Sequence, residues 1–573
     1  MTPDGNGKNR SLARGWRQMA PLLLAVSLVA CSSNPLDKID SITDSLNPFK
    51  AKENEANRGT IGFVEGFLGG VAVDEPRASL VGRDILSSGG SAADVAVAVS
   101  FALSVTLPSS ASLGGGGVCV IHDAVSNTTE SLNFLPAVPK RIPAGTVRPV
   151  AVPGTVRGLA LLHAKYGRLP WSQLVSPAES LARFGNQVSR AFARDLDRMP
   201  PAMKAAPEIL RIFGQGRGGG LIREGDFFKQ LGLSSVLGRI RAHGAGDFYT
   251  GLTGRQFAAA VAKAGGGLDL NDLRSYTPRW LPTLKFPYIQ NTQFHFPMSA
   301  GPSGVLMAQM IGMLIENGDW KDASPAERKH LMAEISARAF SYRKRWLRNG
   351  GGTVVEPAKL VSEESIKSLI AGFQAERHTS GEGGNGSPGA PPGNPTGTGF
   401  VVVDREGSAV ACGLTLNNLF GVGRAASGMG IILAALPGPG GRGPDSLAPM
   451  LLISSLYNVF YFGAAASGGP VASSALAGVA AGAVLGRTAE SLEEALSAKR
   501  VHNNGDPDLT YYEQGIPPAV LEDLLKRGHR LSPTESMGLV NAIFCPAGIP
   551  SEEVLSCETR ADPRGFGLAV GAD

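Results

Sequence analysis

Residues 379–404 read TSGEGGNGSPGAPPGNPTGTGFVVVD, and this stretch joins two opposite kinds of sequence. Its first part, 379–397, has no aliphatic side chain larger than alanine, so it cannot bury enough apolar surface to offset the entropy lost on ordering. Its end, Phe400–Asp404, is an apolar run closed by a carboxylate, which is typical of a buried strand. The sequence therefore predicts a flexible linker that leads directly into a core strand.

A cut at the end of this linker would create a reactive terminus. A threonine α-amine at the start of the strand has a pKa of about 7.7–8.0, so it can act as the base for its own hydroxyl. We favour Thr398 as this nucleophile, because Gly397 before the cut permits the strained turn that self-attack requires. Thr396 is the alternative, and a third interpretation is that neither threonine is a nucleophile.

The rest of the chain predicts an α/β layered core. Residues 77–104 have helical spacing, with Ser91 as a cap and Asp94 three positions later. Gly114–Gly117 lead into an expected strand over 118–123 rather than into a helix, which excludes a phosphate-binding loop. After a mostly helical region over 155–375 and the linker, strands are expected at 400–404, 408–416, 430–436 and 451–462, and helices at 473–485 and 489–497.

Composition and charge exclude several classes of protein. Glycine makes up 75 of 573 residues without the period of collagen, and 43% hydrophobic residues are too many for general disorder. The net charge of +5 comes mostly from the first 30 residues, so the remainder has no general attraction for nucleic acid.

The first 30 residues have the pattern of a secretory signal: a basic start, then the apolar run Pro21–Ala30, which is too short to span a membrane. Cys31 directly follows Leu28–Ala30, as in a bacterial lipobox, where the thiol receives the lipid. The sequence thus predicts a lipid-anchored protein that faces the periplasm. The expected site of the anchor is the outer membrane. An ordinary signal peptide with an incidental cysteine is the alternative.

Four further cysteines remain. Cys119 and Cys412 lie in apolar runs and are expected to be buried core residues. Cys545 and Cys557 are close in sequence and predict a disulfide in an oxidising compartment, with two free thiols as the alternative. No cysteine or histidine motif indicates a metal, and no cofactor is expected.

Over residues 66–573 the chain resembles the gamma-glutamyltranspeptidases, because motifs of this family follow one another in order. These motifs are Gly89–Asp94, Ser112–Gly117, Val152–Gly158, Tyr166–Trp171, Asp247–Tyr249, Leu270–Leu273 with Tyr276, Val402–Gly407, Thr415–Asn417, Phe420–Gly423, Gly468-Gly469 and Asp562–Arg564.

The resemblance implies an αββα sandwich of the N-terminal nucleophile hydrolase type, which cuts itself into a large and a small chain that stay associated. It implies transfer of a γ-glutamyl group to an amine or to water through an acyl-enzyme. Gly468 and Gly469 match the glycines whose backbone N–H groups form the oxyanion hole. Thr415 matches the threonine that hydrogen-bonds the nucleophile, and Asn417 matches a substrate-side amide.

The resemblance divides the precursor into five parts. They are a signal peptide at 1–30, a tether at 31–58, a large-subunit region at 59–378, the linker at 379–397 and a small-subunit region at 398–573.

The chain departs from the family pattern in two places. Counting back from Asp404 without a gap puts Gly397, not Thr398, at the nucleophile position. On the donor side, Leu135 replaces the arginine that clamps the substrate carboxylate, and an aliphatic side chain cannot supply that cation. Lys140 and Arg141 are close in sequence, but we interpret them as solvated surface charges.

The segment that holds the substrate amine in the family is also altered. Its residues are Ala434–Pro439 here, and the serine pair that follows in the family becomes Asp445-Ser446. Ser446 remains a candidate substrate-binding residue, and Asp445 is a candidate for the lost amine-binding charge.

These observations lead to one prediction and two alternatives. The prediction is a hydrolase or transferase acting on glutathione or other small γ-glutamyl amides. The alternatives are a family acylase with a different acyl group and a catalytically silent envelope lipoprotein that uses the fold for binding.

Overall fold

The computed structural model describes residues 68–298, 303–348, 352–379, 397–438, 447–486, 491–551 and 557–572. The expected signal peptide with Cys31, the tether, Thr396 and the pair Asp445-Ser446 lie outside the described residues.

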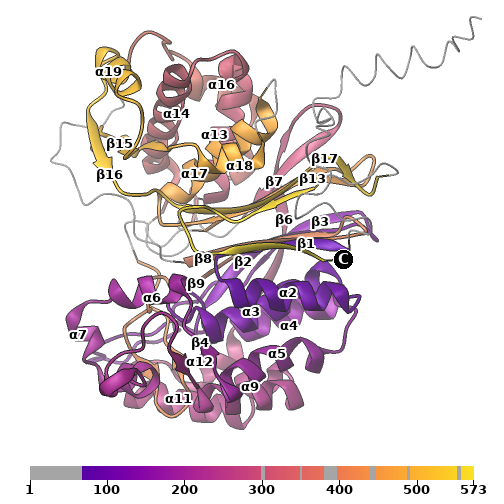
Figure 1. Cartoon of the computed structure of the whole chain (residues 1–573), viewed down its shortest axis with the longest axis vertical. Helices are drawn as coiled ribbons and strands as arrows, with labels where there is room; N and C mark the ends of the chain where they lie inside the picture. Colours follow the sequence, from indigo (N-terminus) through magenta and orange to yellow (C-terminus); the bar gives the residue numbers. More distant parts are fainter. Residues whose placement is uncertain are drawn as a thin grey trace, which may run out of the picture. The chain divides into compact units, whose positions relative to one another are not determined.

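Antiparallel pairing connects twelve strands into one ladder in the order β18-β17-β13-β12-β7-β6-β3-β2-β9-β8-β1-β19. Their bounds are β1 Gly69–Val73, β2 Gly116–Asp123, β3 Thr128–Asn133, β6 Arg279–Pro287, β7 Thr292–Pro297, β8 Gly397–Asp404, β9 Ala409–Thr415, β12 Leu447–Ser454, β13 Val459–Ser467, β17 Leu539–Ile549, β18 Glu558–Arg560 and β19 Leu568–Ala572. The ladder folds back at β6 and β7, so that β8 and β9 pack against β12 and β13 and two sheets face each other (Figure 1).

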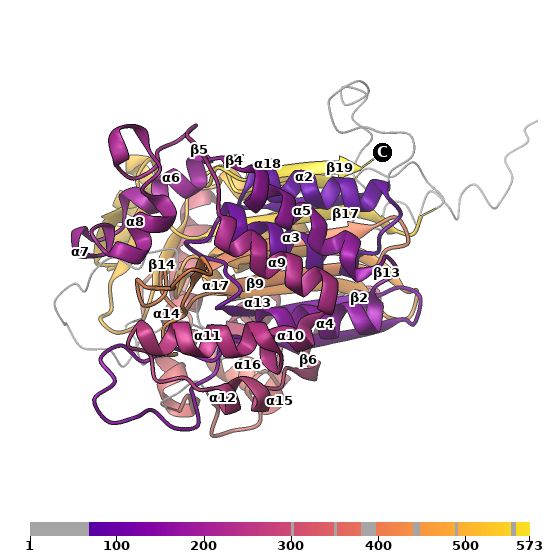
Figure 2. The ribbon, with the colours of Figure 1, turned by 90° about the horizontal axis from the view of Figure 1, so that it is seen from below.

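Helices cover the outer face of each sheet. Against the first sheet, which contains β1, β2, β8 and β9, lie α2 (Pro76–Ser87), α3 (Ala92–Thr106) and α4 (Thr155–Tyr166). Helix α5 (Trp171–Phe184) packs on α3, and α9 (Leu231–His243) packs on α5. Figure 2 looks onto this side of the molecule, where α2 is next to α3, α5 packs on α3 and α9 packs on α5. The other side carries α13 (Ser303–Asn317), α14 (Pro325–Trp346), α16 (Glu363–Ile370), α17 (Val471–Ala480) and α18 (Leu492–Ser497). This is the expected αββα sandwich.

Shorter elements complete the described part of the chain. They are α6 Arg190–Asp197, α7 Pro201–Lys204, α8 Pro207–Phe213, α10 Ala245–Tyr249, α11 Leu252–Lys263, α12 Leu270–Ser275, α15 Pro357–Leu360, α19 Pro518–Lys526, β4 Asn186–Gln187, β5 Phe227–Phe228, β10 Ala425–Ala426, β11 Ile431–Ile432, β14 Val501–Asn503, β15 Thr510–Glu513 and β16 Leu531–Thr534.

Helix α3 shows why small residues suit this architecture. Its N-terminus has the expected capping box, in which the Ser91 side chain accepts from the Asp94 N–H and Asp94 accepts in return. All fifteen of its residues are buried, and most are alanine, valine or serine, so the helix packs closely between the first sheet and α5.

Some sequence expectations are wrong in detail. Over 430–436 only Ile431–Ile432 is a strand, and 451–462 spans two strands, β12 and β13, with the turn between them. The expected helix over 473–485 begins at Val471 as an α-helix and ends in a π-helical turn over Ala481–Leu485.

The cysteines form one disulfide that the sequence did not predict. Cys119 and Cys412 are fully buried, as expected, but they are also joined by a disulfide, because they face each other in the register of β2 and β9. Cys545 and Cys557 form the disulfide that the sequence predicts.

No helix in the described ranges combines the length and hydropathy needed to cross a bilayer.

Candidate active site

Thr398 is the second residue of β8 and is fully buried. Its hydroxyl donates a hydrogen bond of 2.8 Å to Oδ2 of Asp74, the residue that follows β1. Strands β1 and β8 are direct neighbours in the sheet, which brings together two residues that are 324 positions apart. The structure therefore places the proposed nucleophile against a buried carboxylate.

Several further hydrogen-bond donors surround the carboxylate of Asp74. The Gly399 N–H donates to Oδ2 at 3.0 Å, and Nδ2 of Asn541 on β17 donates to Oδ1 at 2.7 Å. The Ser467 hydroxyl lies 3.5 Å from Oδ2. Burial raises the pKa of Asp74 above its ordinary range, although these hydrogen bonds oppose the shift.

Gly468 and Gly469 come directly after Ser467 at the end of β13. Their φ angles are 130° and 79°, in the region that favours glycine, and a Cβ on Gly468 would stand 2.7 Å from Gly538 Cα. Because Asp74 contacts both Thr398 and Ser467, the structure brings the proposed nucleophile close to the proposed oxyanion glycines.

Thr415 lies on the neighbouring strand β9, and its side chain points to the opposite face of the sheet from that of Thr398. The register pairs Gly397 with Thr415 and Thr398 with Leu414, and neighbouring residues of a strand point to opposite faces. The hydroxyl of Thr415 accepts a 2.8 Å hydrogen bond from the Asn417 N–H. The residue opposite Thr415 is therefore Gly397, which is also the residue that counting back from Asp404 without a gap puts at the nucleophile position.

Asn417 is buried with a positive φ of 65°. Its Nδ2 donates to the Ala435 carbonyl at 2.8 Å, whereas its Oδ1 is buried without a hydrogen-bond partner among the described residues. An acceptor without a partner is consistent with the substrate-side role that the family resemblance implies.

The position of the missing arginine is apolar. Leu135 packs with the buried side chains of Val118 and Leu447. A Cβ on Gly397 would lie 2.8 Å from a methyl carbon of Leu447, so this cluster borders the start of β8. Lys140 and Arg141 are exposed, as expected.

A cavity of about 270 Å³ opens at Gly468. Its lining includes Arg194 of α6 and Arg198 just after that helix, together with Glu535 and Phe566. Arg194 lies over the Phe566 ring, 5.6 Å from its centroid, and pairs loosely with Asp195 at 3.4 Å. The cavity thus offers cationic side chains beside the proposed oxyanion glycines.

Sequence reasoning missed Asp74, Asn541 and two of the three arginines that line the cavity, Arg194 and Arg198. Asp74 did carry a signal, since it is a carboxylate directly after the apolar run Val71–Val73. Nothing local in the sequence distinguishes Arg194 or Arg198 from other surface arginines.

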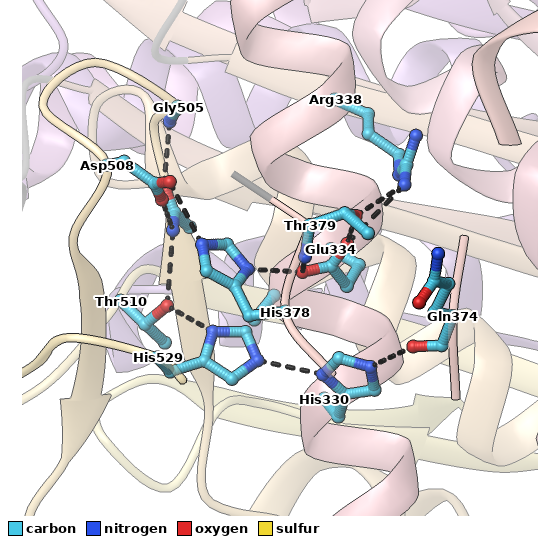
Figure 3. A network of polar contacts seen from close by, with 12 residues as sticks. His330, Glu334, Arg338, Gln374, His378, Thr379, Gly505, Asp508, Thr510 and His529 are labelled. Atoms are coloured by element: carbon cyan, nitrogen blue, oxygen red, sulfur yellow. Dashed lines mark hydrogen bonds and ion pairs between the residues drawn. The ribbon is translucent and has the colours of Figure 1, made fainter. Parts of the chain in front are cut away.

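A histidine cluster lies away from this site, although no sequence motif indicated one. His330 and Glu334 of α14 and His529 have potential metal ligand atoms within 4.8 Å of one another. Figure 3 shows that hydrogen bonds occupy the ring nitrogens instead. His330 Nε2 donates to the Gln374 carbonyl, so its Nδ1 accepts from His529 Nε2 at 2.8 Å, and His529 Nδ1 accepts from Thr510 at 3.1 Å. Each ring nitrogen of His330 and His529 therefore has a hydrogen-bond partner.

The described strands and helices form the αββα sandwich that the family resemblance implies. The gamma-glutamyltranspeptidase family profile matches residues 78–572, and the chain belongs to this family.

The chain is similar to two glutathione hydrolase proenzymes. It is 28% identical to that of Pseudomonas aeruginosa over 550 residues, 88% of this chain and 94% of the relative. It is 29% identical to that of Escherichia coli K12 over 525 residues, 83% and 88% of the two chains. A cephalosporin acylase from Bacillus halodurans shares the fold with a TM-score of 0.74 at 21% identity, over 95% of this chain and 99% of that one.

Proposed function

We propose that the protein is a self-processing amide hydrolase or acyltransferase in which Thr398 is the nucleophile. The observation that carries this proposal is the buried Thr398 hydroxyl, which lies at the start of a core strand and donates to a carboxylate. Cleavage between Gly397 and Thr398 would give a large and a small chain that remain associated.

After cleavage, the Thr398 α-amine would accept the hydroxyl proton while the oxygen attacks the substrate carbonyl. The backbone N–H groups of Gly468 and Gly469 would stabilise the oxyanion, and the protonated α-amine would give its proton to the leaving amine as the acyl-enzyme forms. An acceptor amine or water would then attack the acyl-enzyme and give a proton to the α-amine, which passes it to the departing Thr398 oxygen.

Small γ-glutamyl amides, glutathione among them, are the first proposed donors. The support is family membership and the similarity to glutathione hydrolase proenzymes from two bacteria. Asn417, Asp445 and Ser446 remain proposed substrate-binding residues.

A different acyl donor is the second candidate, and the cluster of Leu135, Val118 and Leu447 favours it. An apolar wall where the family has an arginine gives the α-carboxylate of a glutamyl group no ion pair. The glycine opposite Thr415 favours the remaining candidate, a binding protein without catalysis.

Self-cleavage tests the proposal. Purified full-length protein should resolve into two bands on a reducing denaturing gel, and the smaller band should begin with Thr-Gly-Phe-Val. Thr398→Ala should remain a single band, and Thr415→Ser, which keeps a hydroxyl, is the matched control. A wild-type chain that stays uncut after long incubation would contradict the proposal and favour the binding protein.

The acyl donor is tested separately with γ-glutamyl-p-nitroanilide. Release of p-nitroaniline by the cleaved protein supports a γ-glutamyl donor. Self-cleavage without release assigns the donor to the second candidate class.

We also propose that Cys31 carries a lipid that anchors the protein to the envelope, facing the periplasm. The support is the sequence before Cys31. Cys31→Ser should move the protein from the membrane fraction to the soluble periplasmic fraction, and an unchanged distribution would contradict the anchor.

A further inference from the structure

Self-cleavage needs a base that the mature site does not supply. In the uncut chain the nitrogen of Thr398 belongs to a peptide bond and has no basic lone pair. The α-amine becomes available only after the cut. The first reaction of Thr398 therefore needs another acceptor for its hydroxyl proton.

We propose that Asp74 is the general base of self-cleavage, a role that rests on the proposed function. Its Oδ2 is 2.8 Å from Thr398 Oγ1, within the distance that direct proton transfer requires. A carboxylate only accepts hydrogen bonds, so the Thr398 hydrogen points at Oδ2 and an oxygen lone pair is free for attack.

Hydrogen bonds fix the position of the Asp74 carboxylate, and burial makes it more basic. The Asn541 amide donates to Oδ1 and, at 2.7 Å, to the Gly399 carbonyl, so that it connects Asp74 to β8. Burial raises the pKa of Asp74, and the hydrogen bonds from Gly399, Asn541 and Thr398, together with the charge of Arg194, oppose this shift without cancelling it. A stronger base is a better acceptor for the proton of an alcohol.

The proposed cleavage of the bond between Gly397 and Thr398 proceeds through an ester. Thr398 Oγ attacks the Gly397 carbonyl carbon and gives its proton to Asp74, and the bond from that carbon to the Thr398 nitrogen then breaks. Asp74 returns the proton to the leaving nitrogen, which becomes the free α-amine. Water hydrolyses the resulting ester to a Gly397 carboxylate and a free Thr398 hydroxyl. The step uses the ionised form of Asp74 and regenerates it.

Asp74→Asn tests the proposal, because the amide keeps the size of the carboxylate but cannot accept the proton. The matched control is Glu75→Gln. Glu75 is the neighbouring buried carboxylate, it also has a pKa raised by burial, and it caps α2 by accepting from Ala78 at 2.9 Å. The measurement is the rate of conversion of freshly purified full-length precursor into two bands. Asp74→Asn should slow it by about 100-fold or more, whereas Glu75→Gln should cleave within about threefold of wild type.

The pH profile provides a second readout that a purely structural role would not change. Wild-type cleavage should slow as pH falls through the pKa of Asp74, and the residual cleavage of Asp74→Asn should lack this inflection. Equal cleavage rates in wild type and a folded Asp74→Asn overturn the role of Asp74 and leave the proposed function intact. If Asp74→Asn does not fold by circular dichroism, a wild-type rate that stays constant over the whole pH range in which the precursor remains folded overturns it. A wild-type chain that never cuts overturns the proposed function, and the role of Asp74 with it.

Discussion

At Gly154 the backbone leaves no room for a side chain. A Cβ there would stand 2.0 Å from the Phe134 carbonyl oxygen and 2.3 Å from the Tyr276 hydroxyl. The neighbouring carbonyl is main chain and cannot rotate away, so the clash has no inexpensive relief.

We expect Gly154→Ala to destabilise the protein by on the order of 3 kcal/mol. Gly246→Ala is the matched control, because nothing lies within 4 Å of its Cβ position in α10, and we expect it to be neutral or stabilising. Thermal unfolding of both variants measures the difference. Equal melting temperatures would show that the loop around Gly154 can move.

The arginines of the cavity at Gly468 predict a preference for anionic substrates or acceptors. Arg198 is exposed, so its attraction for a carboxylate is worth up to about 1 kcal/mol, or roughly fivefold in relative rate.

The comparison uses glutaryl-p-nitroanilide and valeryl-p-nitroanilide, which differ in a terminal carboxylate. Arg198→Gln should lower the glutaryl-to-valeryl ratio of kcat/KM by up to about fivefold. Arg255→Gln, which removes an exposed charge from α11, should leave the ratio unchanged. A ratio that Arg198→Gln does not change would assign the cavity no part in recognition.

At the scale of elements, a histidine connects α14 to the loop between β14 and β15. His378 donates to Glu334 and, at 2.9 Å, to Asp508, and two carboxylate partners require both ring nitrogens to be protonated (Figure 3). These carboxylates outweigh burial and raise the pKa of His378 to about 9, whereas burial and the nearby histidines lower that of His529 to about 3.

A raised pKa makes stability depend on pH. Since the pKa of His378 is about 9 when folded and about 6.5 when unfolded, its contribution is complete below about pH 6.5 and is lost as pH rises through 9. We expect the melting temperature to fall by a few degrees between pH 6.5 and 9.5, and His378→Asn to reduce this fall. His243→Asn, at the exposed end of α9, is the control. An equal fall in wild type and His378→Asn would contradict the assignment.

The elements also show what sequence can predict. The core strands and the cap of α3 were predictable because their signals are local: apolar runs, and Ser91 three residues before Asp94. The pair Asp74–Thr398 was not, because its contact depends on the pairing of β1 with β8. Register likewise decides that Thr398 and Thr415 point to opposite faces of the sheet, which motif order alone did not indicate.

At the scale of the whole molecule, family motifs in order were sufficient to predict the four layers. For the candidate site, only some of the features were predictable from the sequence. The family motifs indicated Gly468 and Asn417 as candidates and revealed the change at Leu135, but the apolar cluster around Leu135 and the cationic cavity at Gly468 combine residues from distant parts of the chain. Such a combination is a property of tertiary packing and leaves no local pattern.

The disulfide between Cys119 and Cys412 would determine how the products of the proposed self-cleavage hold together. Cys119 precedes the linker and Cys412 follows it, 293 positions later in the chain. Cutting at Gly397 would therefore add two chain ends without creating a second molecule. On a non-reducing gel the processed protein should migrate as one species, which a reductant splits in two, and Cys412→Ser should separate without reductant. Two bands from wild type without reductant would show that this bond is not formed. With the bond in place, the two halves cannot exchange with those of another copy, and each small chain keeps the large chain with which it was synthesised.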